Sequence, residues 1–217
     1  MKDLILQKLR ADYTVAARDT GRFAVMKKNG MKFVISSYEI RGFGSMSVIE
    51  MSAMLGLMKM ESFILTAETK DLPLFSGDFI RAAGRCTLLE EFYDTMIAPL
   101  PEASAEGFRR VKARYADLPP FKTEPRWYDS IRYDFTLGAS DKSLKTLKET
   151  ITAEYWEAYR EAAARADDAD PAEKKARTRV YVDGLFRNGG PAVNQFKKLF
   201  GEETARELFE KYIFACR

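Results

Sequence analysis

The sequence of 217 residues contains no histidine. A chain without imidazole cannot form a Ser-His or Cys-His nucleophile pair, and it lacks the side chain whose ordinary pKa best suits proton transfer near neutral pH. The two cysteines, Cys86 and Cys216, are far apart and have no metal-type spacing, so we interpret them as reduced thiols and expect no metal site. Acid-base chemistry therefore falls to Asp, Glu, Tyr, Lys or Cys, with the surroundings setting the pKa.

The sequence also lacks a run of about 18 apolar residues and a charged-then-apolar leader, so neither membrane spanning nor export is expected. Its formal net charge of +3 falls short of the dense basic stripe of a nucleic-acid-binding protein. With 46% hydrophobic and 31% charged residues, the composition is typical of a chain that folds. We expect one cytoplasmic, monomeric domain over residues 1–217, with no membrane or nucleic-acid partner.

The N-terminal half is rich in β-type runs joined by tight turns. The runs pair as 22–28 with 31–37, 45–55 with 59–68, and 73–82 with 85–94. Asn29-Gly30 favours a two-residue hairpin turn, and Gly56 and Ala83-Gly84 mark the other two turns. Because consecutive strands joined by tight turns pair antiparallel, the sequence predicts one antiparallel sheet of about six strands.

After Pro99 the spacing of apolar residues becomes helical. Following a short opening helix, the expected helices cover 102–118, 140–167, 171–188 and two further segments near the C-terminus, with an extended piece at 133–137 that rejoins the sheet. Several strands carry apolar residues on both parities, as Phe63, Ile64 and Leu65 do. Burial of both faces requires helices on both sides, so the pattern predicts an α/β fold, a three-layer α/β/α sandwich with a central antiparallel sheet.

One apolar run contains an acid, Asp78 in DLPLFSGDFIRAAG (71–84). A buried, unpaired carboxylate destabilises the fold or shifts its pKa until it holds a proton. If the strand register brings Glu61 onto the same face, the two acids form a pair in which repulsion raises one pKa. The alternative is that both acids are exposed at strand ends or paired with Arg81 and Arg85.

Two segments resemble the ferredoxin-dependent bilin reductases, especially their phycocyanobilin-forming members. LPLFSGDFI (72–80), preceded by ESFILTAETKD, is similar to the central hairpin of that family. FRNGGPAVNQFKKLFGEETARELFEKYIF (186–214) is similar to its closing segment. The resemblance covers most of the chain from about residue 40 and implies the family's α/β/α sandwich, which agrees with the periodicity.

The resemblance implies reduction of a linear tetrapyrrole, a bilin such as biliverdin, with electrons from reduced ferredoxin or flavodoxin and no bound flavin or metal. It implies that Asp78 donates a proton to the bilin, with Glu61 as its coupled partner at the position of a family histidine. The candidate substrate contacts are Asn188, Phe75, Phe63 and Ser76. An acidic ferredoxin is expected to dock on the basic clusters Arg109 to Arg114 or Lys142 to Lys148.

Besides Glu61, the sequence departs from the family in two further places. Gly189 replaces the second acid of the family's C-terminal Asn/Asp pair, and TLGAS (136–140), which matches the segment of a propionate-binding arginine, has no basic residue. A non-catalytic tetrapyrrole carrier or haem-breakdown accessory protein on the same scaffold is therefore the alternative. A relative of the red chlorophyll catabolite reductases and an interaction domain without pigment also stay open.

Overall fold

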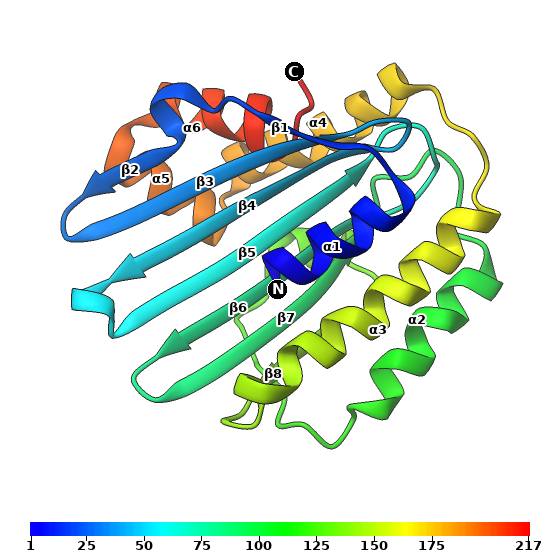
Figure 1. The fold of residues 1–217 in the computed structure, drawn as a ribbon, viewed down its shortest axis with the longest axis horizontal. Coiled ribbons are helices and arrows are strands. Elements are labelled where there is room, and N and C mark those ends of the chain that lie inside the picture. Colours follow the sequence, from blue (N-terminus) through cyan, green and yellow to red (C-terminus); the bar gives the residue numbers. More distant parts are fainter.

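The computed structural model describes residues 1–217 as one eight-stranded sheet with helices on both faces (Figure 1). The strands are β1 (Val15–Arg18), β2 (Val25–Lys28), β3 (Met31–Ile40), β4 (Gly44–Ala53), β5 (Met58–Ala67), β6 (Leu74–Ala82), β7 (Arg85–Tyr93) and β8 (Leu137–Ser140). They lie in the order β1-β3-β4-β5-β6-β7-β8, with β2 also paired to β3, and every pairing is antiparallel. The predicted α/β/α sandwich with an antiparallel sheet is confirmed.

The helices form two layers. One face of the sheet packs against α1 (Lys2–Asp12), α2 (Glu102–Arg114) and α3 (Leu144–Arg165), and the other against α4 (Pro171–Asn188), α5 (Pro191–Phe200) and α6 (Glu202–Leu208). A π-helical turn at Phe209–Ile213 follows α6, and 3-10 helices lie at Gly21–Phe23, Met54–Gly56 and Trp127–Ile131. None of these helices combines the length and the apolarity that crossing a bilayer requires.

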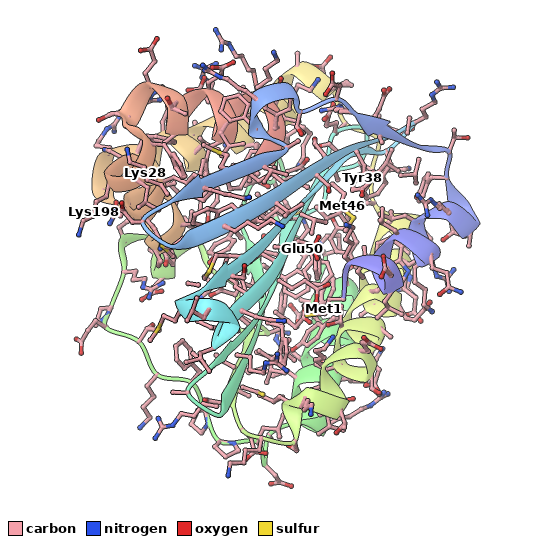
Figure 2. All side chains as sticks on the ribbon, turned by 60° about the vertical axis from the view of Figure 1, so that its left-hand side comes forward. Met1, Lys28, Tyr38, Met46, Glu50 and Lys198 are labelled. Carbon is pink, nitrogen blue, oxygen red and sulfur yellow. The ribbon has the colours of Figure 1, made fainter.

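Each layer of helices has its own apolar core because successive strand residues point to opposite faces. Tyr38 and Met46, which are Cα partners on β3 and β4, belong to the core beneath α1 and α3 (Figure 2). Phe33 and Ile35 on β3 belong to the core beneath α5 and α6. Burial on both faces explains why these strands carry apolar residues at both parities.

Two edge strands differ from the expectation. The pattern did not predict β1, whose four half-buried or exposed residues pair with β3 and are too few to show alternation. The extended piece expected at 133–137 joins the sheet mainly further along the chain, as β8, with an isolated bridge between Tyr93 and Arg132 before it.

Three of the four tight turns between paired strands lie at one end of the sheet, on the left of Figure 1; these join β2 to β3, β4 to β5, and β6 to β7. The fourth, at 41–43 between β3 and β4, lies at the opposite end. The longer connections at 68–73 and 94–101 lie at the opposite end, where α3 also ends. We refer to these two ends as the hairpin end and the connector end.

Candidate functional site

Asp78 lies in the middle of β6 and faces the layer of α4, α5 and α6. It shares this face with Leu74, which belongs to the core of that layer. Directly across on β5 is Ser62, whose Oγ donates a hydrogen bond to Asp78 Oδ1. Burial raises the pKa of the Asp78 carboxyl to about 7, the Ser62 hydrogen bond opposes this, and the nearby charge of Glu91 adds to it. Asp78 therefore exchanges its proton near neutral pH.

Glu91 is the second acid on this face. It lies on β7, across from Ser76 of β6, while Leu89 lies across from Asp78. Arg132 Nη1 donates to Glu91 Oε1 at 3.1 Å, and the Arg132 guanidinium also lies 2.9 Å from Asp129. The ion pair with Arg132 gives the negative charge of Glu91 a compensating partner.

Tyrosine side chains form the wall next to these acids. Tyr93 of β7 stacks on Tyr181 of α4 with ring centroids 4.9 Å apart, and Tyr128 meets Tyr93 edge-on at 5.6 Å. Burial raises the pKa of Tyr181 well above its ordinary value, and the charges of Glu91 and Asp78 act in the same direction. The Tyr181 hydroxyl is therefore neutral and remains a hydrogen-bond donor at neutral pH.

A polar hollow with a cavity volume of about 290 Å3 opens beside this cluster. Leu89 and Glu91 form its floor, and Arg126, Arg132 and Lys112 give it three cations. The remaining lining residues are Phe121, Thr123, Asp129, Tyr133, Asp134, Thr136 and Gly138. Asp78 is not part of the lining, but its cross-strand partner Leu89 is, so the hollow begins one strand away from the acid.

The expected pairing of Glu61 with Asp78 is wrong. The register places Ser62 opposite Asp78 and Glu61 opposite Phe79, so Glu61 points to the face of α1 and α3. There the carboxylate accepts from Lys2 N at 2.6 Å and lies 3.0 Å from the terminal amino group. Burial raises the pKa of Glu61, but these contacts outweigh that effect and lower it overall. Glu61 is thus an ionised acid of the opposite face.

The expected substrate contacts divide between the two faces. Phe63 and Phe75 lie in the core beneath α3, 1% and 0% exposed, with their rings edge-to-face at 5.0 Å. Both side chains are buried on the opposite face from Asp78, so the structure does not bring them together with that acid. Ser76 does share the face of Asp78 and is buried. Asn188 is exposed at the end of α4, in a hollow that also contains Trp127 and Arg126.

Only some of the basic residues named from the sequence have carboxylate partners. Asp78 forms no ion pair with Arg81 or Arg85, both of which are exposed. Arg109 pairs with Glu102 and Asp134, and Arg114 pairs with Glu154 at 2.9 Å. These two cations are therefore largely compensated within the chain.

Sequence reasoning missed most of the residues around Asp78. Ser62, Glu91, Tyr93, Arg132 and Tyr181 come from two strands, a loop and α4, and no sequence spacing connects them. Alternation along β7 does place Glu91 and Tyr93 on one face of the strand. The register of the β6-β7 hairpin, once known, shows that this is the face of Asp78. The chain has no group of three or more His, Cys, Asp or Glu side chains that could hold a metal ion.

Comparisons with known proteins support the fold. No family model matches the sequence, and no curated protein sequence matches it. Among solved structures, the chain is similar to the phytochromobilin synthase from tomato in complex with biliverdin, with a TM-score of 0.77 and 13% sequence identity. The match covers 99% of this chain and 83% of that one. At this identity the likeness shows a shared fold.

Proposed function

We propose that this chain reduces a linear tetrapyrrole, a bilin such as biliverdin, with single electrons from a ferredoxin- or flavodoxin-type protein. The observation that carries the proposal is Asp78, an acid with a pKa of about 7 beside a tyrosine wall and a polar hollow. The shared fold with a biliverdin-bound protein adds support. A bilin needs both features, because it is a flat conjugated pigment that takes up protons as it is reduced.

The chemistry balances with two electrons and two protons. The first electron gives a bilin radical anion, whose pyrrole nitrogens and carbonyl oxygens become more basic. Asp78 then transfers its proton to that radical and is left as a carboxylate. A second electron and a second proton, which comes from solvent, complete the reduction, and solvent reprotonates Asp78 through its partly exposed edge.

Ser62 and Glu91 adjust the acid in opposite directions. The Ser62 hydroxyl donates to Asp78 and so stabilises the carboxylate that remains after proton transfer. The negative charge of Glu91 disfavours that carboxylate and helps Asp78 to keep its proton before electrons arrive. A pKa near the working pH is the balance that general acid catalysis requires.

The groups around Asp78 fit the polar and apolar parts of a bilin. Tyr93 and Tyr181 stack on each other and are 4% and 7% exposed, so a conjugated pigment would meet only the edge of this pair. Arg126, which lines the hollow and contacts the Tyr128 hydroxyl, forms no ion pair within the chain. It is therefore available for the propionate carboxylate of a bilin, and the cation takes the place of the basic residue that TLGAS (136–140) lacks.

An electron donor must dock on a basic surface if it is an acidic ferredoxin. In each of the two clusters expected from the sequence, two cations form no ion pair: Arg110 and Lys112 in the first, and Lys142 and Lys145 in the second. The other members, Arg109, Arg114 and Lys148, are paired within the chain. Both clusters therefore remain candidate docking surfaces for the donor. Such docking weakens as salt screens the charges.

The experiment that tests the proposal is titration of biliverdin into the purified protein, followed by anaerobic addition of reduced ferredoxin. We expect a shifted absorbance band on binding and loss of that band on reduction. Binding with no spectral change under reducing conditions would instead support a tetrapyrrole carrier. That alternative is favoured by the position of Glu61 on the far face, which leaves Asp78 without the partner expected from the sequence.

A further inference from the structure

The hairpin end of the sheet carries only positive charge. Its three tips span 25–32, 52–60 and 79–87, and they contain six cations and no carboxylate. The cations are Lys27, Lys28, Lys32, Lys59, Arg81 and Arg85. Lys28, at the end of the β2-β3 hairpin, is labelled in Figure 2. Three separate turns therefore bring one sign of charge to one surface.

None of these six cations has an ion-pair partner within the chain. All six are exposed, and none lies within 4.0 Å of a carboxylate, whereas Lys70, Arg109 and Arg114 do. The connector end is mixed in charge, with exposed Asp94, Asp167 and Asp170 beside exposed Arg41 and Arg165, and with Asp168 paired to Lys70. Charge of a single sign therefore distinguishes the hairpin end, and it orients the protein in front of an anionic surface.

The middle tip adds apolar side chains to this surface. Met54, Leu55 and Leu57 are 67%, 106% and 72% exposed, and no other turn of the chain exposes three large apolar residues. The backbone at Met54 and Leu55 is left-handed, with φ of 51° and 54°. A non-glycine residue adopts this conformation at an energetic cost, and here the result is a convex apolar knob between two cationic hairpins.

Behind this knob lies a hollow with a cavity volume of about 360 Å3. Lys32, Lys59 and Arg81 of the tips line it, together with Lys148 of α3. Its two carboxylates already have partners, because Glu50 lies 3.2 Å from Lys2 Nζ and Glu61 lies 3.0 Å from the terminal amino group. The hollow therefore keeps positive charge available for a phosphate-type anion.

We propose that the hairpin end binds the surface of a bilayer that contains anionic phospholipid. Met54, Leu55 and Leu57 enter the interface between headgroups and acyl chains, and the six cations contact the anionic headgroups. A convex apolar knob fits a fluid lipid surface better than a protein surface, which needs a matching concavity over a large contact area. The sequence led us to expect no membrane partner because no segment spans a bilayer, and surface binding requires no such segment.

With the hairpin end on the bilayer, the part of the Asp78 face nearest the hairpin tips lies toward the membrane. Met58, Met60 and Ile80 belong to two of the tips and lie on the same face as Asp78, on its hairpin side, and all three are only partly buried. With the knob in the bilayer, this apolar strip leads from the membrane surface toward Asp78. Only this step rests on the proposed function: a poorly soluble pigment reaches Asp78 along the apolar strip.

The test is sedimentation of the full-length protein with vesicles, in the absence of any pigment. We expect the protein to pellet with phosphatidylcholine vesicles that contain about 30% phosphatidylglycerol, to stay in solution with pure phosphatidylcholine, and to be released between about 0.05 M and about 0.5 M salt. The double variant Lys59→Gln/Arg81→Gln should bind about 25-fold more weakly, since each cation near an anionic surface contributes about fivefold. The double variant Leu55→Asn/Leu57→Asn should also lose binding.

The matched control is Arg10→Gln/Arg110→Gln, which removes two exposed and unpaired cations outside the hairpin end. It should bind like the unmodified protein. Failure of the unmodified protein to bind anionic vesicles overturns the proposal, and so does an equal loss in the control. Binding to an acidic protein but not to vesicles assigns the surface to a protein partner and also overturns it. Because no pigment is used, none of these outcomes bears on bilin reduction.

Discussion

Ser62 and Asp78 face each other across β5 and β6, and the serine hydroxyl donates a hydrogen bond to the aspartate. Burial and the nearby charge of Glu91 raise the pKa of this carboxyl. The hydrogen bond from the neutral Ser62 hydroxyl limits the rise, which leaves the pKa of Asp78 at about 7.

Ser62→Ala should raise the pKa of Asp78 further. The hydroxyl stabilises the carboxylate, and its loss removes an interaction of about 1 kcal/mol, or somewhat less than one pKa unit. The measurement is a pH titration of the Asp78 carboxyl by NMR or infrared spectroscopy. Ser76→Ala, on the same face of β6 but without a hydrogen bond to Asp78, serves as the control. A lower pKa in Ser62→Ala is incompatible with the account.

Asp78 should make the protein less stable as the pH rises. Its carboxyl has a pKa of about 7 in the folded chain and about 3.9 when unfolded. The folded state therefore binds the extra proton between these values, and the free energy of unfolding falls as pH rises through about 7. Asp78→Asn should be more stable than the unmodified protein at pH 8, by about 1–3 kcal/mol, with little difference at pH 4. Denaturant unfolding at both pH values measures this.

The control for that experiment is Glu124→Gln, which changes an exposed carboxylate that forms no ion pair. Its stability should follow that of the unmodified protein at every pH. The quantity compared is the free energy of unfolding of Asp78→Asn minus that of the unmodified protein. If this difference is smaller at pH 8 than at pH 4, the raised pKa of Asp78 is refuted.

The hydrogen bond from Thr152 to Glu90 should contribute to the stability of the protein. Glu90 is 0% exposed beneath α3, Thr152 Oγ1 donates to its Oε1, and its Oε2 has no partner. Burial raises the pKa of Glu90 well above its ordinary value. Thr152→Val should cost about 1–3 kcal/mol of unfolding free energy because it removes the one donor to a buried acid. Thr152→Ser, which keeps the hydroxyl, should cost less, and equal losses in both variants count against the contact.

Glu61→Gln should leave bilin reduction intact, whereas the family resemblance gives this position a part in catalysis. The side chain points to the face of α1 and α3, away from Asp78. Turnover of biliverdin by the purified variant measures the effect. The variant should lose some stability, because it loses an ion pair with the terminal amino group. A loss of turnover greater than tenfold, with folding preserved, places Glu61 in the reaction.

Strand pairing was predictable from the sequence only where the connection between two strands fixes their register. The hairpins β2-β3 and β6-β7 were predictable because a two-residue turn fixes which residues pair across the strands. The six-residue connection 68–73 between β5 and β6 fixes no such register. The face of Glu61 relative to Asp78 depended on that register, and a shift of one residue reverses it. The surroundings of Asp78 were equally hidden, since Arg132 and Tyr181 reach it only through tertiary packing.

The most direct test of the central claim is a comparison of the unmodified protein with Asp78→Asn during anaerobic reduction of bound biliverdin by reduced ferredoxin, followed by absorbance and electron paramagnetic resonance. The account predicts that both proteins bind biliverdin with similar affinity, that the unmodified protein yields a reduced bilin, and that Asp78→Asn stops after one electron with an accumulated organic radical. Equal rates of complete reduction by the two proteins would contradict it.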